Sequence, residues 1–125
     1  MNIPEDLKYT KDHEWARIEG DTAIVGITDY AQGELGDIIF IEFPNVGDAF
    51  DQGEAFGTVE AVKTVADLFT PLSGQIIAIN SDLENAPGKV NNDPYSEGWM
   101  VKIQISNPGE VDQLLDATRY KDLIL

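Results

Sequence analysis

Residues 56–74 read F-G-T-V-E-A-V-K-T-V-A-D-L-F-T-P-L-S-G, and this stretch folds back on itself if Val62 and Lys63 are the centre of a turn. Alternate residues then share a face, which is the two-residue period of β-strands and predicts a hairpin over residues 55–70. The predicted facing pairs are Ala61 with Thr64, Glu60 with Val65, Val59 with Ala66, Thr58 with Asp67, Gly57 with Leu68 and Phe56 with Phe69.

The residues at the predicted turn are unusual for a tight hairpin. Favoured two-residue turns contain Asn-Gly, Asp-Gly or a leading Gly, because their central residues need positive φ. Val62 and Lys63 do not favour such a turn. Lysines on hairpin tips are ordinarily only solvated. This chain, however, has just eight cationic residues in all, and Lys63 lies between Glu60 and Asp67. This arrangement suggests that its amine is presented to a partner.

Short runs on either side of the hairpin predict a mostly β domain spanning residues 1–125. Turn residues separate two alternating runs, 14–19 and 22–27, which predict a second hairpin. Residues 38–43 and 75–80 are expected to be strands, the first covered on both faces, and residues 99–105 another. Thr28 is expected to cap a short helix over 29–35, Ser81 a second, and Asn107 a C-terminal one.

The composition restricts the chemistry and the partners. The chain has no cysteine, which excludes disulfides, thiolate metal sites and cysteine nucleophiles. Its formal charge of −15 argues against nucleic acid and anionic membranes, and favours basic docking surfaces on protein partners if it is more than a means of solubility. No apolar run is long enough to span a membrane, and residues 1–8 do not resemble a targeting segment. A cytoplasmic monomer is expected, although a processed mitochondrial form would look similar.

Catalytic groups are scarce. His13 is the only histidine, and a lone histidine beside Glu14 and Trp15 is more often structural than catalytic. Neither a nucleophile elbow, nor a glycine-rich phosphate loop, nor a metal-spaced cluster occurs. The aromatic residues are most simply core or rim side chains. The residues therefore do not indicate a free-standing enzyme.

Motifs along nearly the whole chain resemble the H protein family of the glycine cleavage system. The attachment hairpin G-E-A-F-G-T-V-E-A-V-K is similar to that family's lipoyl-attachment signature, although many members have serine where Ala61 stands. Residues 86–89 and Asp12 also differ from common versions, which leaves the fine contacts of the arm open. The other matching motifs are Y-T-K-D-H-E-W (9–15), G-I-T-D-Y-A-Q (26–32), L-G-D-I (35–38), N-N-D-P-Y-S-E-G-W (91–99) and L-L-D-A-T-R-Y (114–120).

This resemblance implies a flattened sandwich of two small antiparallel sheets, like lipoyl and biotinyl carriers, with short peripheral helices and a C-terminal helix. It implies lipoate bound as N6-lipoyllysine at Lys63, attached by a lipoate ligase or an octanoyltransferase. Glu60 and Asp67 would be recognised by those enzymes, unless they are merely solvated. Glu14 would line a cleft where the loaded arm folds back and its amine meets a carboxylate.

The resemblance also implies the partners. Glycine decarboxylase, a pyridoxal-phosphate enzyme, would release carbon dioxide from glycine and pass the aminomethyl group to the arm. Aminomethyltransferase would move the methylene unit to tetrahydrofolate and release ammonia. Dihydrolipoyl dehydrogenase would then reoxidise the arm with NAD.

Other swinging-arm carriers fit the sequence less well. Biotin carriers usually flank their lysine with methionines, and lipoyl domains of 2-oxo-acid dehydrogenases usually show Asp-Lys-Ala, whereas Val62 and Thr64 flank Lys63 here. Two alternatives stay open at this point: a lipoyl donor in cofactor relay, and an H-like carrier that serves another redox system. A plain acidic interaction module with an unmodified lysine is the third class.

Overall fold

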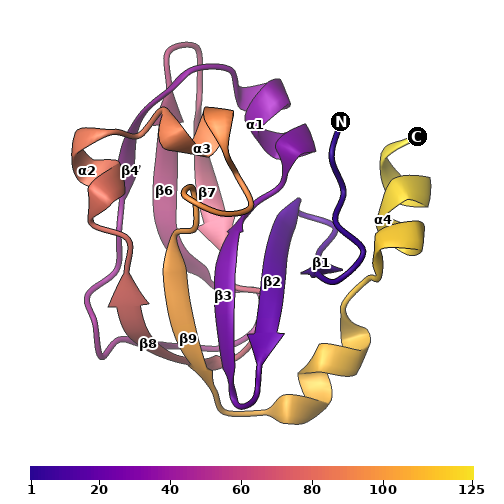
Figure 1. The fold of residues 1–125 in the computed structure, drawn as a ribbon. Coiled ribbons are helices and arrows are strands. Elements are labelled where there is room, and N and C mark those ends of the chain that lie inside the picture. Colours follow the sequence, from indigo (N-terminus) through magenta and orange to yellow (C-terminus); the bar gives the residue numbers. More distant parts are fainter.

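The computed structural model describes all residues, Met1–Leu125, and contains two antiparallel sheets that face each other (Figure 1). The large sheet has six strands in the order β1-β2-β3-β9-β8-β5, and the small sheet has three in the order β4-β6-β7. The strands of the large sheet are β1 (Lys8–Tyr9), β2 (Glu14–Glu19), β3 (Thr22–Ile27), β9 (Val101–Ile105), β8 (Gly74–Ile79) and β5 (Ala49–Phe50). Those of the small sheet are β4 (Ile38–Glu42), β6 (Ala55–Ala61) and β7 (Val65–Phe69).

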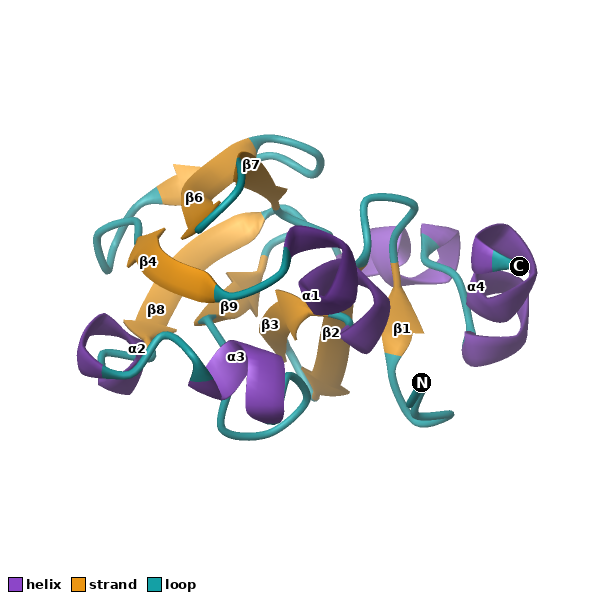
Figure 2. Ribbon diagram, turned by 90° about the horizontal axis from the view of Figure 1, so that it is seen from above, coloured by secondary structure: helices purple, strands orange, loops and turns teal.

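Short helices lie at the margins of the sheets (Figure 2). Thr28 caps α1, as predicted: its hydroxyl accepts a hydrogen bond from the amide of Ala31, and the helix ends at Gly36. The helices are α1 (Asp29–Leu35), α2 (Asp82–Asn85), α3 (Lys89–Asn92), the 3₁₀ helix η1 (Pro108–Gln113) and α4 (Ala117–Ile124). None of them is both long and apolar enough to cross a membrane.

Two apolar clusters hold the sheets in place. The main cluster of 18 buried residues fills the space between the sheets, and includes Val59 and Leu68 from the central hairpin. A second cluster of six lies on the other side of the large sheet, beneath the N-terminal segment and α4. There the Trp15 ring covers Gly26 on the paired strand, and the Tyr9 and Tyr120 rings stack at 4.6 Å. Trp15, Tyr95 and Tyr120 are therefore core residues and Trp99 is partly buried, which agrees with the core or rim positions predicted for these four.

The predicted pairing of the central hairpin is confirmed from Glu60–Val65 to Gly57–Leu68, but it is wrong at the base. Ala55, not Phe56, pairs with Phe69, because β6 carries an irregularity between Ala55 and Gly57. Phe56 turns inward as a result and is buried in the main cluster. A β-bulge inserts one unpaired residue and so shifts every side chain beyond it, which alternation alone does not predict.

Three further predictions are wrong in detail. The strand from Ile38 is covered on one face only: Ile41 is buried against the core, whereas Ile39 and Phe40, on the outer face of the small sheet, are half exposed. Ser81 precedes α2, but its side chain makes no capping hydrogen bond. The C-terminal helix is broken in two, because Leu115 leaves the helical path and pairs with Tyr9.

The start of η1 differs from the prediction as well. Asn107 provides no side-chain cap, although Pro108 does occupy the first turn. Glu110 is buried and binds Ser73 instead, accepting 2.8 Å and 2.9 Å hydrogen bonds from its amide and hydroxyl. Glu110 therefore ties η1 to the start of β8.

Gly57 provides a test of the packing between β4 and β6. A Cβ at this position would overlap the backbone oxygen of Glu42 on the neighbouring strand. Gly57→Ala is therefore expected to lower the free energy of unfolding by about 2 kcal/mol or more, the range seen for overpacked cores. Gly33→Ala, on the exposed side of α1 with nothing near its Cβ, is the matched control. Urea unfolding of both variants that gave equal midpoints would contradict this packing.

Candidate functional site

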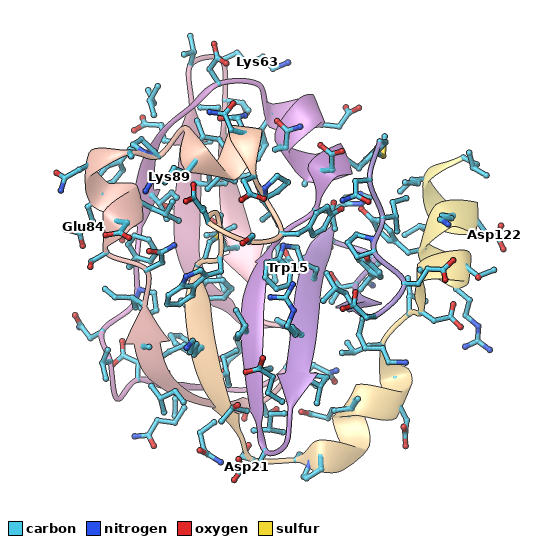
Figure 3. All side chains as sticks on the ribbon, viewed as in Figure 1. Trp15, Asp21, Lys63, Glu84, Lys89 and Asp122 are labelled. Carbon is cyan, nitrogen blue, oxygen red and sulfur yellow. The ribbon has the colours of Figure 1, made fainter.

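Lys63 lies at the outer end of the β6–β7 hairpin, beyond the body of the molecule (Figure 3). Its side chain is exposed and points to the side on which α1 lies. The hairpin below it is anchored by Val59 and Leu68, which are buried between the sheets. A fixed base and a free end are what a carrier of a covalently attached group needs.

The tip is held by backbone hydrogen bonds rather than by favourable turn residues. The amide of Ala61 donates to the carbonyl of Thr64 at 2.8 Å, which closes the two-residue turn as predicted. Val62 and Lys63 both keep negative φ, so the turn is not of the types that demand glycine or asparagine. The amide of Val62 donates to the carbonyl of Asp37 at 3.0 Å, and this bond ties the tip to the segment before β4.

The stem of Lys63 rests against Gly36. Gly36 ends α1 with a φ of 80°, a conformation that favours glycine, and a Cβ there would lie 3.4 Å from Cε of Lys63. That distance is an ordinary van der Waals contact, so a side chain would fit beside the lysine stem. The G of the L-G-D-I motif therefore has a conformational reason, its positive φ.

Below the tip, a cleft of about 320 Å³ lies between α1 and the hairpin. Its floor is apolar, and carboxylates of several elements line it. The apolar lining comes from Ile27, Ala31, Leu35, Val59, Ala66 and Leu68, and the polar lining from Asp12, His13, Glu14, Tyr30, Glu34 and Asp67. Such a cleft suits a largely apolar chain that ends in a cation.

Glu14 is the buried carboxylate of this cleft, with only 2% of its surface exposed. It accepts a 2.7 Å hydrogen bond from the hydroxyl of Thr10 and a longer one, 3.4 Å, from the amide of Phe69 on β7. Burial raises the pKa of Glu14 to about 8, against the opposing effect of these two bonds. Glu14 also borders a second groove of about 420 Å³ on the side of Thr70 and Pro71.

His13 forms part of the cleft wall and joins it to α4. It has a φ of 69° despite being a non-glycine residue, and its Nδ1 lies 2.9 Å from the hydroxyl of Tyr120. The Tyr120 hydroxyl also lies 2.7 Å from that of Thr28, the residue that caps α1. The pKa of His13 is lowered, chiefly by burial. These contacts agree with the structural role predicted for this histidine.

The structure brings some of the predicted site residues together and separates one. Glu14 and Asp67 line the cleft, Asp67 at its exposed rim. Glu60 lies on the opposite, outer face of the small sheet and does not line the cleft. No group of three or more His, Cys, Asp or Glu side chains is arranged so that it could hold a metal ion.

The sequence analysis missed the contribution of α1. Tyr30, Ala31, Glu34 and Leu35 all line the cleft. Their spacing is that of one helical face, so a signal was present in the predicted helix 29–35. What the sequence could not show is that this face lies opposite β6 and β7.

Comparison with known proteins agrees with this geometry. The family model described as "Glycine cleavage H-protein" matches residues 7–125. The chain belongs to the glycine cleavage H-protein family.

Individual relatives match over nearly the full length of both chains. The "Glycine cleavage system H protein" of Staphylococcus carnosus is 51% identical over 99% of this chain and 98% of its own. The protein of the same name from Symbiobacterium thermophilum is 55% identical over 95% of this chain and 93% of its own. A crystal structure of a glycine cleavage system H protein from Mycobacterium marinum superposes with a TM-score of 0.88. That structure has 42% identity and covers 96% of this chain and 97% of its own. The predicted family and fold class are thus confirmed.

The buried carboxylate of Glu14 predicts a specific pH dependence. Between its ordinary pKa of 4.5 and about 8, the folded chain keeps a proton on Glu14 that the unfolded chain releases. This contribution to stability is complete below the ordinary pKa and is lost as the pH rises through the folded value. The free energy of unfolding of the parent should therefore fall between about pH 5 and about pH 9 as Glu14 ionises. Glu14→Gln cannot ionise, so its free energy of unfolding should fall less over this range, by on the order of 3 kcal/mol.

Urea unfolding across this pH range measures the difference. Glu34→Gln is the control, because Glu34 lines the same cleft but is exposed. Parallel pH profiles for the parent and Glu14→Gln would show that the Glu14 carboxyl titrates normally in the folded chain.

Proposed function

We propose that Lys63 is the residue through which this chain acts as lipoyl carrier of the glycine cleavage system, with lipoate bound as N6-lipoyllysine. The observation that carries the proposal is the exposed lysine at the end of a hairpin whose base is buried. The full-length match to the glycine cleavage H-protein family supports the system in which the carrier works. The chain is then a protein substrate of several enzymes and not itself a catalyst.

The residues around Lys63 fit a lipoyl arm. Bound lipoate supplies a dithiolane, the sulfur chemistry that this cysteine-free chain lacks. The apolar floor of the cleft, including Ile27 and Leu68, matches the hydrocarbon part of such an arm, and the buried carboxyl group of Glu14 matches an amine at its end. Lys63 contributes the reach, because its stem already lies above the cleft against Gly36.

The proposed residue roles follow from these positions. Glu14 holds the amine of the loaded arm away from water, with Asp67 at the cleft entrance. Glu60 and Asp67 are exposed on the strands that flank the lysine, where a lipoate ligase or an octanoyltransferase would meet them. Glu60 acts from the outer face only.

The proposed partners are glycine decarboxylase, aminomethyltransferase and dihydrolipoyl dehydrogenase. Each must accept Lys63 and its arm in an active site, so each needs a surface that fits the end of the hairpin. The charge of −15 favours basic rims on these surfaces and disfavours nucleic acid and anionic membranes. A cytoplasmic monomer is the simplest form for such a shuttle.

A second candidate keeps the arm and changes the task. The chain would then donate lipoyl groups to other proteins, or serve another redox system. Genes for glycine decarboxylase and aminomethyltransferase beside the gene for this chain would favour the glycine cleavage system. A neighbouring lipoate ligase among unrelated oxidoreductases would favour the relay.

Mass spectrometry tests the attachment residue directly. Expression with lipoate and a lipoylating enzyme should add one lipoyl amide to the peptide that contains Lys63, and Lys63→Arg should abolish the addition while keeping the charge. Lys89→Arg, which removes a lysine far from the hairpin tip, should leave it unchanged (Figure 3). An unmodified Lys63 in the parent would remove the proposal, and a biotin adduct would move the chain to carboxyl transfer.

The role of Glu14 is tested on the loaded carrier. Glu14→Ala should release the aminomethyl group to water faster, by about tenfold if one charged hydrogen bond is lost. Ammonia release measured over time gives the rate, and Glu34→Ala is the control on the same cleft. Release at the rate of the parent would mean that Glu14 does not protect the amine.

A further inference from the structure

The outer face of the small sheet exposes apolar side chains close to Lys63. Ile39 and Phe40 on β4 are 52% and 53% exposed, and Val65 on β7 is 60% exposed. Single exposed apolar residues are normal on protein surfaces. These three differ because the strand pairing places them together.

The register of the small sheet forms a row across three strands. Phe40 pairs with Glu60, and Glu60 pairs with Val65, so the carboxylate of Glu60 stands between two exposed apolar side chains. Paired side chains in such a row lie roughly 5 Å apart. Ile39 falls at an irregularity in β4, where one extra residue is inserted beside Phe40. We call Ile39, Phe40, Glu60 and Val65 the outer patch.

Nothing within the chain covers the outer patch. The other face of this sheet is packed on the core through Ile41, Val59 and Leu68. In Figure 2, β6 and β7 form the upper margin of the molecule, with β8 below them and no helix above. Bulges at exposed edges often re-aim side chains at functional sites.

Charge restricts the kind of partner that fits the outer patch. Lys63 is the only cation in β4 and in the hairpin, whereas Glu42 and Glu60 are exposed carboxylates on the outer face. A complementary surface therefore has an apolar contact area for Phe40 and Val65 and a lysine or arginine opposite Glu60.

The short length of the Lys63 side chain distinguishes among the enzymes that could bind the outer patch. Attachment forms an amide bond between the Lys63 nitrogen and the carboxyl carbon of an activated lipoate, releases the activating group and gives a proton to solvent. The attaching enzyme must bring its acyl donor to the end of the short lysine stem, so its surface must contact the flanking strands. Enzymes that act at the end of the finished arm stand further away.

We propose that the outer patch is the docking surface for the enzyme that attaches lipoate to Lys63, through an apolar surface with a cation opposite Glu60. This inference rests on the proposed function and adds the apolar residues of β4 and β7 to the recognition surface. The acidic residues alone would attract any basic protein. Strand pairing, by contrast, holds the Phe40–Glu60–Val65 row in a fixed position relative to the hairpin turn and Lys63. The outer patch thus determines which enzyme binds, and the negative charge increases the rate at which a basic enzyme meets this chain.

The experiment is a rate of attachment. Phe40→Ser, Val65→Ser and the double variant are given to a purified lipoate ligase with lipoate and ATP, and intact mass follows the lipoyl adduct. We expect kcat/KM of the double variant to fall at least about tenfold, as for loss of anchors at an interface. Val46→Ser and Ile77→Ser, which truncate exposed apolar residues outside the outer patch, should keep the rate of the parent.

Three controls make the result decisive. Thermal unfolding and acylation of Lys63 by a small activated ester should be unchanged in the Ser variants, which excludes misfolding and altered amine reactivity. Chemically lipoylated variants should be reduced by dihydrolipoyl dehydrogenase with NADH at a rate within about twofold of that of the parent. An equal loss with both enzymes would show that the outer patch serves every partner, and would overturn the assignment to attachment.

The remaining outcomes are also distinct. A parent that is never lipoylated overturns the proposed function itself, whereas a parent and double variant modified at equal rates overturn only this inference. Sedimentation of the parent tests self-association. A dimer that Phe40→Ser dissociates would make the outer patch an interface between copies of this chain, contrary to the proposal.

Discussion

The structure depends on the apolar contact between the central hairpin and the large sheet. Val59 and Leu68 are almost completely buried there, while Val62 and Lys63, a few residues away, are exposed. Both strands of the hairpin are paired, and the amide of Val62 at its tip donates a hydrogen bond to the carbonyl of Asp37. These contacts restrict motion of the backbone at the tip. The flexible part of the carrier is then the lysine stem and the group attached to it. Under the proposed function the arm would swing from a fixed point, which would keep the effective concentration of its end high at each site within reach.

The same contact creates the cleft. It is the space that remains between α1, the large sheet and the inner face of β6 and β7. Glu14 lies at that space because it occupies the inner face at one end of β2, next to the unpaired edge of β7. Ionisation of a buried carboxyl group is costly while the cleft is empty. It becomes favourable when an ammonium group binds beside it. Under the proposed function, burial of Glu14 would favour an arm that carries an amine over an empty one.

The parts of this arrangement that follow local rules could be predicted from the sequence. The hairpin register from Glu60 to Gly57, the hairpin of β2 and β3, and the Thr28 cap each depend on neighbours within a few residues. Two of the failures depend on contacts between distant segments. Phe56 is displaced by the irregularity at Gly57, which approaches the backbone of β4 closely, and the C-terminal helix breaks because Leu115 pairs with Tyr9. Lys63 was predicted as a site and Glu14 as part of a cleft, but most of the other residues that line the cleft were not predicted, because residues 12–14, 27–35 and 59–68 meet only in the fold.

The alternation of a β-strand explains how one short hairpin can have two surfaces with different tasks. On β6, Val59 faces the core and the cleft, and its neighbour Glu60 faces outward between Phe40 and Val65. A substitution on one face therefore need not disturb the other, because the backbone between them is fixed by pairing on both sides of β6. In the proposed scheme the outer face governs how the arm is attached, and the inner face governs how its cargo is kept. One residue, half of the two-residue strand period, separates the two faces, and Lys63 lies at the end of the hairpin that has both.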